Sequence, residues 1–233
     1  MVASHVAGVS RRELLRTGSV VAAGAIAGPA LAGGQLQALA MFQGPVQSPN
    51  QRAATVRATP VSPVTIRPDL FRRALAALQR HQSQVVLRDR IALVDFDLPS
   101  SKPRFHVVDL ASGRSRSLLV SHGRGSDPEH SGWLSRFSND VGSAASSSGA
   151  FVTGDVYVGQ HGRSRRLVGL DRTNDNAEPR AIVVHSAWYV SPEMVAQHGK
   201  LGRSEGCFAV STAELEYTLQ TLGAGRMIYA DKV

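Results

Sequence analysis

The chain has one cysteine, Cys207, and the residues around it are compatible with catalytic chemistry. Residues 201–208 read Leu-Gly-Arg-Ser-Glu-Gly-Cys-Phe, so the sequence is polar up to the thiol and apolar after it. Gly206 permits a tight turn or a positive φ directly before the sulfur. Such a turn would present a nucleophilic thiol and direct nearby backbone N–H groups at one point, as an oxyanion site requires. The alternative at this point is a small buried hydrophobic residue, a common role of free cysteine.

A cysteine nucleophile needs a base that removes the thiol proton near neutral pH. His185 is the nearest upstream candidate, and it ends the run Ala181-Ile182-Val183-Val184, which predicts a buried strand. A histidine at a strand end combines a fixed backbone with an open side, which suits a positioned base. Four other histidines compete for this role, and we favour the first as a pocket residue: His122, His130, His161 and His198.

The single cysteine also excludes other kinds of site. An internal disulfide framework, a four-cysteine zinc site and a cluster held by several thiolates all need more thiols. The histidines are too widely spaced for a usual zinc pattern, in which two of them lie a few residues apart. We therefore expect no metal and no other cofactor.

Two stretches in the second half of the chain resemble the catalytic domain of murein L,D-transpeptidases of the YkuD type. They are His185-Ser186-Ala187-Trp188-Tyr189-Val190-Ser191 and Gly202-Arg203-Ser204-Glu205-Gly206-Cys207. The second is most similar to a divergent branch whose cysteine motif reads Gly-Arg-Ser-x-Gly-Cys. The resemblance covers about residues 67–233, because further motifs precede these in the same order: Asp95-Phe96, Arg104 to Leu110, Ser121 to Ser126, Phe137-Ser138-Asn139, Gly142-Ser143 to Gly149, and Tyr157 to Gly162.

This resemblance implies a β-rich domain that acts on peptidoglycan stem peptides. Cys207 matches the family nucleophile, and His185 matches the base that takes the thiol proton. Ser186 stands where related enzymes use a residue, often through its backbone carbonyl, to orient the imidazole. Gly206 and Cys207 would supply oxyanion N–H groups. The thiolate would attack a meso-diaminopimelate (or similar) carbonyl, expel the terminal D-alanine, and pass the acyl group to an amine or to water.

The cysteine motif departs from the commoner family pattern, which is Ser-His-Gly-Cys with an Arg or Asn two residues after the cysteine. Glu205 replaces that histidine, and Ala209 occupies the Arg or Asn position. An ionised Glu205 close to the thiol would raise the thiol pKa, whereas a Glu205 that points away could meet the acceptor amine. Arg203 is our candidate to replace the missing arginine.

We assign substrate contacts to four residues near these motifs: His122, Tyr189, Arg203 and Ser204. Three functions stay open. They are cross-linking of two stem peptides, hydrolysis of the same acyl-enzyme by an L,D-carboxypeptidase or endopeptidase, and wall binding by an inactive protein. The choice between amine and water depends on the shape of the acceptor site, which the sequence does not give.

The first residues resemble an export signal. Ser10-Arg11-Arg12-Glu13-Leu14-Leu15-Arg16 precedes an uncharged run, Thr17 to Leu31, and a small-x-small pattern, Ala30-Leu31-Ala32. Paired arginines before a weakly hydrophobic run are typical of the twin-arginine signal. Glycines and Pro29 interrupt this run, which is also too short for a bilayer span of roughly 20 residues. We expect a signal peptide over residues 1–32 and action in the periplasm or cell wall.

The chain is basic, with 26 Lys+Arg against 18 Asp+Glu and a formal charge of +8. Removal of residues 1–32 takes away three arginines and one glutamate, which lowers the charge to +6. Nucleic acid is not an expected partner outside the cytoplasm. A basic exported protein is suited to an anionic wall polymer or membrane surface, although arginines scattered over a solvated surface explain the charge equally well.

The pattern predicts a mainly β fold with α insertions, and the family resemblance implies a β-sandwich of the YkuD type. A proline-rich linker is expected at residues 33–66, and a helix capped by Asp69 and ending near His81 begins the catalytic domain at 67–233. Residues 122–149 are expected to form a long loop. The expected strands are Ile91–Phe96, Phe105–Leu110, Ser117–Ser121, Ala150–Tyr157, Arg166–Leu170, Ala181–His185 and Met227–Ala230, with helices at Ser191–Gln197 and Thr212–Leu222.

Overall fold

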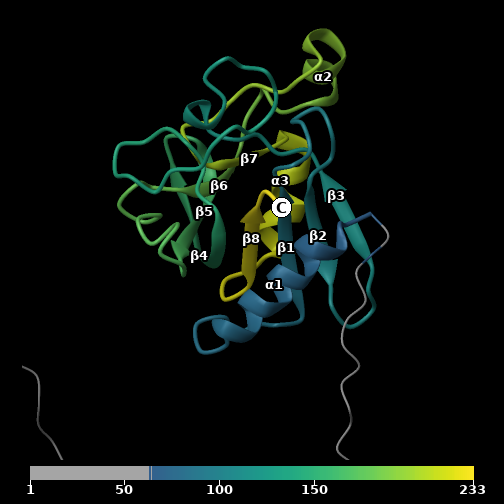
Figure 1. The fold of residues 1–233 in the computed structure, drawn as a ribbon, viewed down its shortest axis with the longest axis vertical. Helices are drawn as coiled ribbons and strands as arrows, with labels where there is room; N and C mark the ends of the chain where they lie inside the picture. Colours follow the sequence, from purple (N-terminus) through teal and green to yellow (C-terminus); the bar gives the residue numbers. More distant parts are fainter. Residues whose placement is uncertain (1–62, 64) are drawn as a thin grey trace, which may run out of the picture. The chain divides into compact units, whose positions relative to one another are not determined.

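A computed structural model of the chain describes residues 63 and 65–233 (Figure 1). The predicted signal peptide and nearly all of the predicted linker lie outside these residues. No helix within the described part is long and apolar enough to cross a membrane.

Eight strands form one hydrogen-bonded sheet in the order β3-β2-β1-β8-β4-β5-β6-β7. The strands are β1 (Arg90–Asp95), β2 (Phe105–Asp109), β3 (Ser115–Leu118), β4 (Gly149–Gly159), β5 (Gly162–Gly169), β6 (Val183–Ser186), β7 (Phe208–Val210) and β8 (Met227–Asp231). The helices are α1 (Pro68–Arg80), α2 (Pro192–His198) and α3 (Thr212–Thr221), with a 3-10 turn η1 (Arg124–Ser126). The predicted mainly β fold with α insertions is confirmed.

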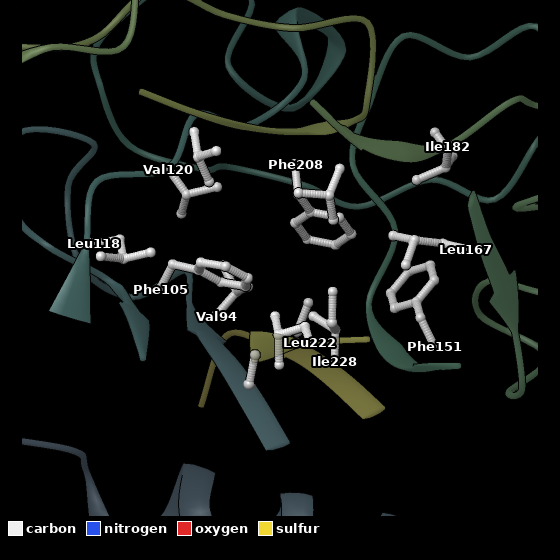
Figure 2. Close-up of a cluster of buried hydrophobic side chains, with 14 of the residues drawn as sticks. Val94, Phe105, Leu118, Val120, Phe151, Leu167, Ile182, Phe208, Leu222 and Ile228 are labelled. Atoms are coloured by element: carbon white, nitrogen blue, oxygen red, sulfur yellow. The ribbon is translucent and has the colours of Figure 1, made fainter. Parts of the chain in front are cut away.

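The sheet buries apolar side chains on both faces. Ile91 and Leu93 of β1 belong to the cluster that includes Leu70 and Ala74 of α1, which lies over β1 and β8 (Figure 1). Ala92 and Val94 belong to the larger cluster of Figure 2. Because successive side chains of a strand point to opposite faces, the unbroken apolar run of β1 follows from burial on both sides.

The sheet curls so that its two ends meet. Phe208 of β7 stacks on Phe96, directly after β1, with ring centroids 6.3 Å apart. A flat sheet would separate strands five places apart by roughly 24 Å at the usual strand spacing. The chain leaving β3 then reaches the free edge of β7, where the Ser121 N–H donates to Ala209 O at 3.0 Å. This closure gives the expected sandwich its two layers.

Several predicted boundaries differ from the observed ones for local reasons. Asp69 does not cap α1, because Pro68 is the first helical residue and Asp69 lies in the first turn. Strand β3 ends at Leu118, since residues 119–121 leave it toward β7. Strand β6 begins only at Val183, because Ala181 has φ of 53°. The three-residue β7 was not predicted.

Two other predictions from the sequence hold. Ser191 caps α2, with its side chain accepting a hydrogen bond from the Met194 N–H, and Pro192 is the first helical residue. Residues 122–149 are irregular apart from η1 and the first residue of β4.

Candidate active site

Cys207 lies one residue before β7, and 7% of its surface is exposed. The thiol donates a hydrogen bond to Ala181 O, with Sγ 3.6 Å from the oxygen. Burial raises the pKa of the Cys207 thiol, whereas the Val183 N–H and the charge of Arg180 lower it. Glu205 also raises it, as the smallest of these effects. The thiol therefore needs a base and local electrostatic help to ionise.

His185 lies on β6, which pairs in parallel with β7 in the register Val184↔Phe208 and His185↔Ala209. Val184 and Phe208 belong to the core cluster of Figure 2, so His185 and Cys207 project from the opposite face. The register thus brings the histidine and the cysteine together on adjacent strands, although they are 22 residues apart in the sequence.

The imidazole of His185 is oriented by the next residue. Its Nδ1 lies 2.9 Å from Ser186 O, and since a carbonyl only accepts, Nδ1 carries the proton. Nε2 is then free to accept a proton. Burial lowers the pKa of His185, so the ring is neutral at pH 7. Within residues 63 and 65–233 no hydrogen bond joins His185 to Cys207, so proton transfer requires the thiol to turn away from Ala181 O.

The loop before Cys207 is held from within by Ser204. Its hydroxyl donates to Cys207 O at 2.7 Å and accepts from the Gly206 N–H at 3.2 Å, and the side chain is buried. The structure thus gives Ser204 a place inside the loop instead of the predicted substrate contact. The Gly206 N–H, predicted as an oxyanion donor, is directed at Ser204. The Cys207 N–H, by contrast, has no hydrogen-bond partner among the described residues.

A second segment, residues 121–125, holds the loop before Cys207 in place through backbone hydrogen bonds. The Ser204 N–H donates to His122 O at 2.9 Å, and the Arg124 N–H donates to Ser204 O at 2.7 Å. Gly123 and Gly206 pack backbone to backbone, since a Cβ on Gly123 would lie 2.8 Å from Gly206 N and 2.2 Å from Ala144 O. Gly206 itself has φ of 115°, in the region that favours glycine.

His122 lies beneath this contact instead of in a pocket, which corrects the predicted substrate role. Its ring is 1% exposed because Arg104 and Asp127 hold both nitrogens: Arg104 Nη2 donates to Nδ1 at 2.7 Å, and Nε2 lies 3.2 Å from an Asp127 carboxylate oxygen. Burial and the charge of Arg104 lower the pKa of His122 to about 4. The histidine is therefore a neutral link between two buried charges.

The family model described as the L,D-transpeptidase catalytic domain matches residues 63–230. The chain belongs to this family. Similar solved structures are L,D-transpeptidases from Mycobacterium smegmatis (16% identity, TM-score 0.36, covering 61% of this chain and 58% of that chain), Mycobacterium tuberculosis H37Rv (14%, 0.39, 62% and 58%) and Stackebrandtia nassauensis (12%, 0.37, 62% and 56%). The chain thus spans less than two thirds of these structures. No curated protein matches it.

Two residues of the L,D-transpeptidase cysteine motif take positions away from the thiol. Arg203 donates through Nη1 to Asp127 O and to Pro128 O, so it ties the motif to the long loop, and its substrate contact stays a prediction. Glu205 is exposed, and its carboxylate pairs with Arg124 at 2.7 Å. The glutamate therefore points outward.

Tyr189 lies beside the cysteine loop, as the predicted substrate role requires. A Cβ on Gly202 would lie 2.6 Å from the Tyr189 Cβ, so Gly202 allows the ring to pack closely against the loop. Burial raises the pKa of Tyr189 to about 12, with a contribution from the charge of Cys207. Tyr189 stays a neutral phenol next to the thiol.

His161 is a site residue that the sequence grouped with the pocket candidates but did not connect to His185. It is exposed and lies in the two-residue turn between β4 and β5, where Gly159 pairs with Gly162. Its ring stacks on His185 with centroids 4.3 Å apart and an interplanar angle of 21°. No sequence spacing links a hairpin turn to a strand that begins more than 20 residues later.

Within the described residues no group of three or more His, Cys, Asp or Glu could hold a metal ion.

Gly206→Ala should lower the rate at which a stem peptide acylates Cys207 by about 10²-fold. The reason is that the added Cβ would lie 2.8 Å from Ala145 O and displace the thiol. Gly142→Ala is the matched control, since Gly142 also has a positive φ (85°) but nothing lies within 4 Å of its added Cβ. Both variants incur backbone strain of about 1–3 kcal/mol. Equal acylation rates in the two variants would contradict the packing argument.

His122→Gln should flatten the dependence of stability on pH. The folded-state pKa of His122 lies at about 4, below its ordinary 6.5, so the unfolded chain binds more protons between these values. The wild-type free energy of unfolding should therefore fall by about 2–3 kcal/mol from this residue as pH drops from 6.5 to 4. Urea unfolding at pH 7 and pH 5 measures it, with exposed His198→Gln as control. An unchanged slope in His122→Gln would refute the neutral-histidine assignment.

His161→Ala should raise the pKa of His185 toward 6.5, because it exposes one face of the ring to water and removes a neighbouring cation at acid pH. The acid limb of the pH–rate profile then moves to higher pH, and an NMR titration of the His185 ring reports the same shift. His161→Phe keeps the stacked ring without the charge and should give a smaller shift. If the His185 titration in His161→Ala matches wild type, the stack has no electrostatic role.

Proposed function

We propose that the protein is a peptidyltransferase that cross-links peptidoglycan stem peptides through an acyl-enzyme on Cys207. The observation that carries this proposal is the orientation of His185, whose Nδ1–H donates to Ser186 O and leaves Nε2 as a base beside the cysteine loop. A nucleophile, a base and a group that orients the base are the parts that covalent catalysis by cysteine needs. Membership of the L,D-transpeptidase family supports the same chemistry.

In the first half-reaction His185 Nε2 takes the thiol proton, and the Cys207 thiolate attacks the carbonyl carbon of the donor stem peptide. The Cys207 N–H is suited to stabilise the oxyanion of the tetrahedral intermediate. Collapse of that intermediate breaks the amide bond to the terminal D-alanine, and the His185 imidazolium returns its proton to the departing amine. The product is a thioester on Cys207, with His185 neutral again.

In the second half-reaction the amine of another stem peptide attacks the thioester. His185 Nε2 takes a proton from the attacking nitrogen, the new amide forms, and the thiolate leaves and recovers a proton. Water in place of the amine would give hydrolysis. We assign a substrate contact in this step to Tyr189, which is half-buried beside the thiol.

We further propose that the protein is exported through a twin-arginine-type signal at residues 1–32 and acts in the periplasm or cell wall. Paired Arg11 and Arg12 before an uncharged run, and a substrate class that lies outside the cytoplasm, support this proposal. The positive charge that remains after removal of residues 1–32 suits binding to an anionic cell-wall polymer.

Incubation of the purified protein with tetrapeptide muropeptides, followed by mass spectrometry of the products, tests the activity. We expect cross-linked dimers from wild type and at least about 10³-fold less product from Cys207→Ala and His185→Ala, because each removes one half of the nucleophile–base pair. His198→Ala, which replaces an exposed histidine on α2, is the matched control and should retain full activity.

Three other results would each change the proposal. Tripeptides without dimers would indicate a hydrolase that uses the same acyl-enzyme. No turnover by wild type would favour a wall-binding protein. Undiminished dimer formation by Cys207→Ala would contradict the mechanism outright.

A further inference from the structure

The cysteine motif lacks the Arg or Asn that the commoner family pattern has two residues after the cysteine. Ala209 occupies that position, and it is fully buried in the cluster beneath α2. Arg203 donates to carbonyl oxygens of the long loop, and Arg124 is paired with Glu205 on the surface. A buried thiolate without a nearby positive charge would be costly, so an ionised Cys207 requires a cation from another part of the chain.

Arg180 approaches the cysteine from the segment that leads into β6. Its Nη2 would lie 3.2 Å from a Cβ on Gly206, the residue before Cys207, so the missing side chain of Gly206 makes room for the guanidinium. The next residue, Ala181, has φ of 53°, and its carbonyl accepts the hydrogen bond of the thiol at 3.6 Å. Residues 180 and 181 therefore contact the cysteine and its neighbour together.

The hydrogen bonds of Arg180 hold the guanidinium in place without neutralising it. Nη1 donates to Ser138 O at 2.7 Å and to Ser147 Oγ at 2.5 Å. Nη2 donates to Ser143 O at 3.0 Å and to Ala145 O. All four acceptors are uncharged, and among the described residues no carboxylate forms an ion pair with Arg180. Its Nε is buried and has no hydrogen-bond partner in the described part of the chain.

We propose that Arg180 is a positioning residue whose uncompensated positive charge stabilises the thiolate of Cys207, since Ala209 supplies no charge two residues after the cysteine. The inference rests on the proposed role of Cys207 as the nucleophile. The same four loop hydrogen bonds fix the charge beside Gly206, so it needs no movement when the thiol ionises. Cys207 is buried and Arg180 is half-buried, so their attraction is screened less by water than that between two exposed charges.

The other titratable groups that face the thiol do not supply this charge. Glu205 is exposed and opposes ionisation, and its effect on the thiol is smaller than that of Arg180. Tyr189 is a neutral phenol, and His185 is neutral at pH 7. Asp140 faces Arg180 from the long loop and acts on it only through a long-range attraction. Arg180 is therefore the cation that acts on Cys207.

The pH dependence of Cys207 alkylation by iodoacetamide, measured on the full chain, tests this assignment, because the thiolate is the reacting form. Arg180→Gln should raise the midpoint of the rate profile by about one pH unit or more, and so slow alkylation near neutral pH by about tenfold. Arg180→Lys should keep the midpoint near the wild-type value. Arg203→Gln is the matched control, because it also removes an arginine bound to loop carbonyls and should leave the midpoint unchanged.

Ser147→Asp keeps Arg180 in place but gives it a carboxylate partner, and it should also raise the midpoint. If Arg180→Gln does not fold, Ser147→Asp still tests whether the charge of Arg180 sets the midpoint of the alkylation profile. An unchanged midpoint in the folded variants, or an equal shift in Arg203→Gln, would overturn the proposal. Alkylation does not depend on peptidoglycan. A shifted midpoint in a protein that forms no muropeptide product would therefore contradict the proposed function and leave the role of Arg180 intact.

Discussion

The geometry of the site depends on a backbone contact between Gly123 and Gly206. Neither residue can carry a side chain there, because carbonyl and amide atoms fill the space that a Cβ would need. The contact forms where the curled sheet closes and the chain leaving β3 runs along the free edge of β7. Sheet closure, the turn at Gly206 and the position of the thiol are thus parts of one packing arrangement.

Electrostatics then divides the residues around this contact into two groups. Beneath it, Arg104, His122 and Asp127 form a fully buried network in which a neutral imidazole links two charges. On the side of the thiol, His185 is held as a neutral base and covered by the ring of His161. The two charges of the first group have opposite signs and are hydrogen-bonded through His122, so this group supports the loop, whereas the second group holds the proposed nucleophile and base.

The sequence was informative where local pattern and chemistry coincide. An apolar run that ends in histidine predicted the strand of His185, and glycine before cysteine predicted the turn. His122 and Ser204 were assigned substrate contacts but are buried, because a polar residue in a polar loop looks solvent-exposed until the fold closes over it. The partners of His122 are Arg104, which directly precedes β2, and Asp127 of the long loop. Strand β7 has three residues and is too short to give a periodic signal. The stack of His161 on His185 likewise exists only in three dimensions.

The proposed mechanism requires that a stem peptide acylates Cys207. Rapid mixing of the protein with a tetrapeptide muropeptide whose free side-chain amine is acetylated, so that it cannot act as acceptor, followed by acid quenching and peptide mapping by mass spectrometry, would test it directly. We expect a tripeptide acyl group on the peptide that contains Cys207, formed together with free D-alanine. Release of D-alanine with an unmodified Cys207 and an acyl group on another residue would contradict it.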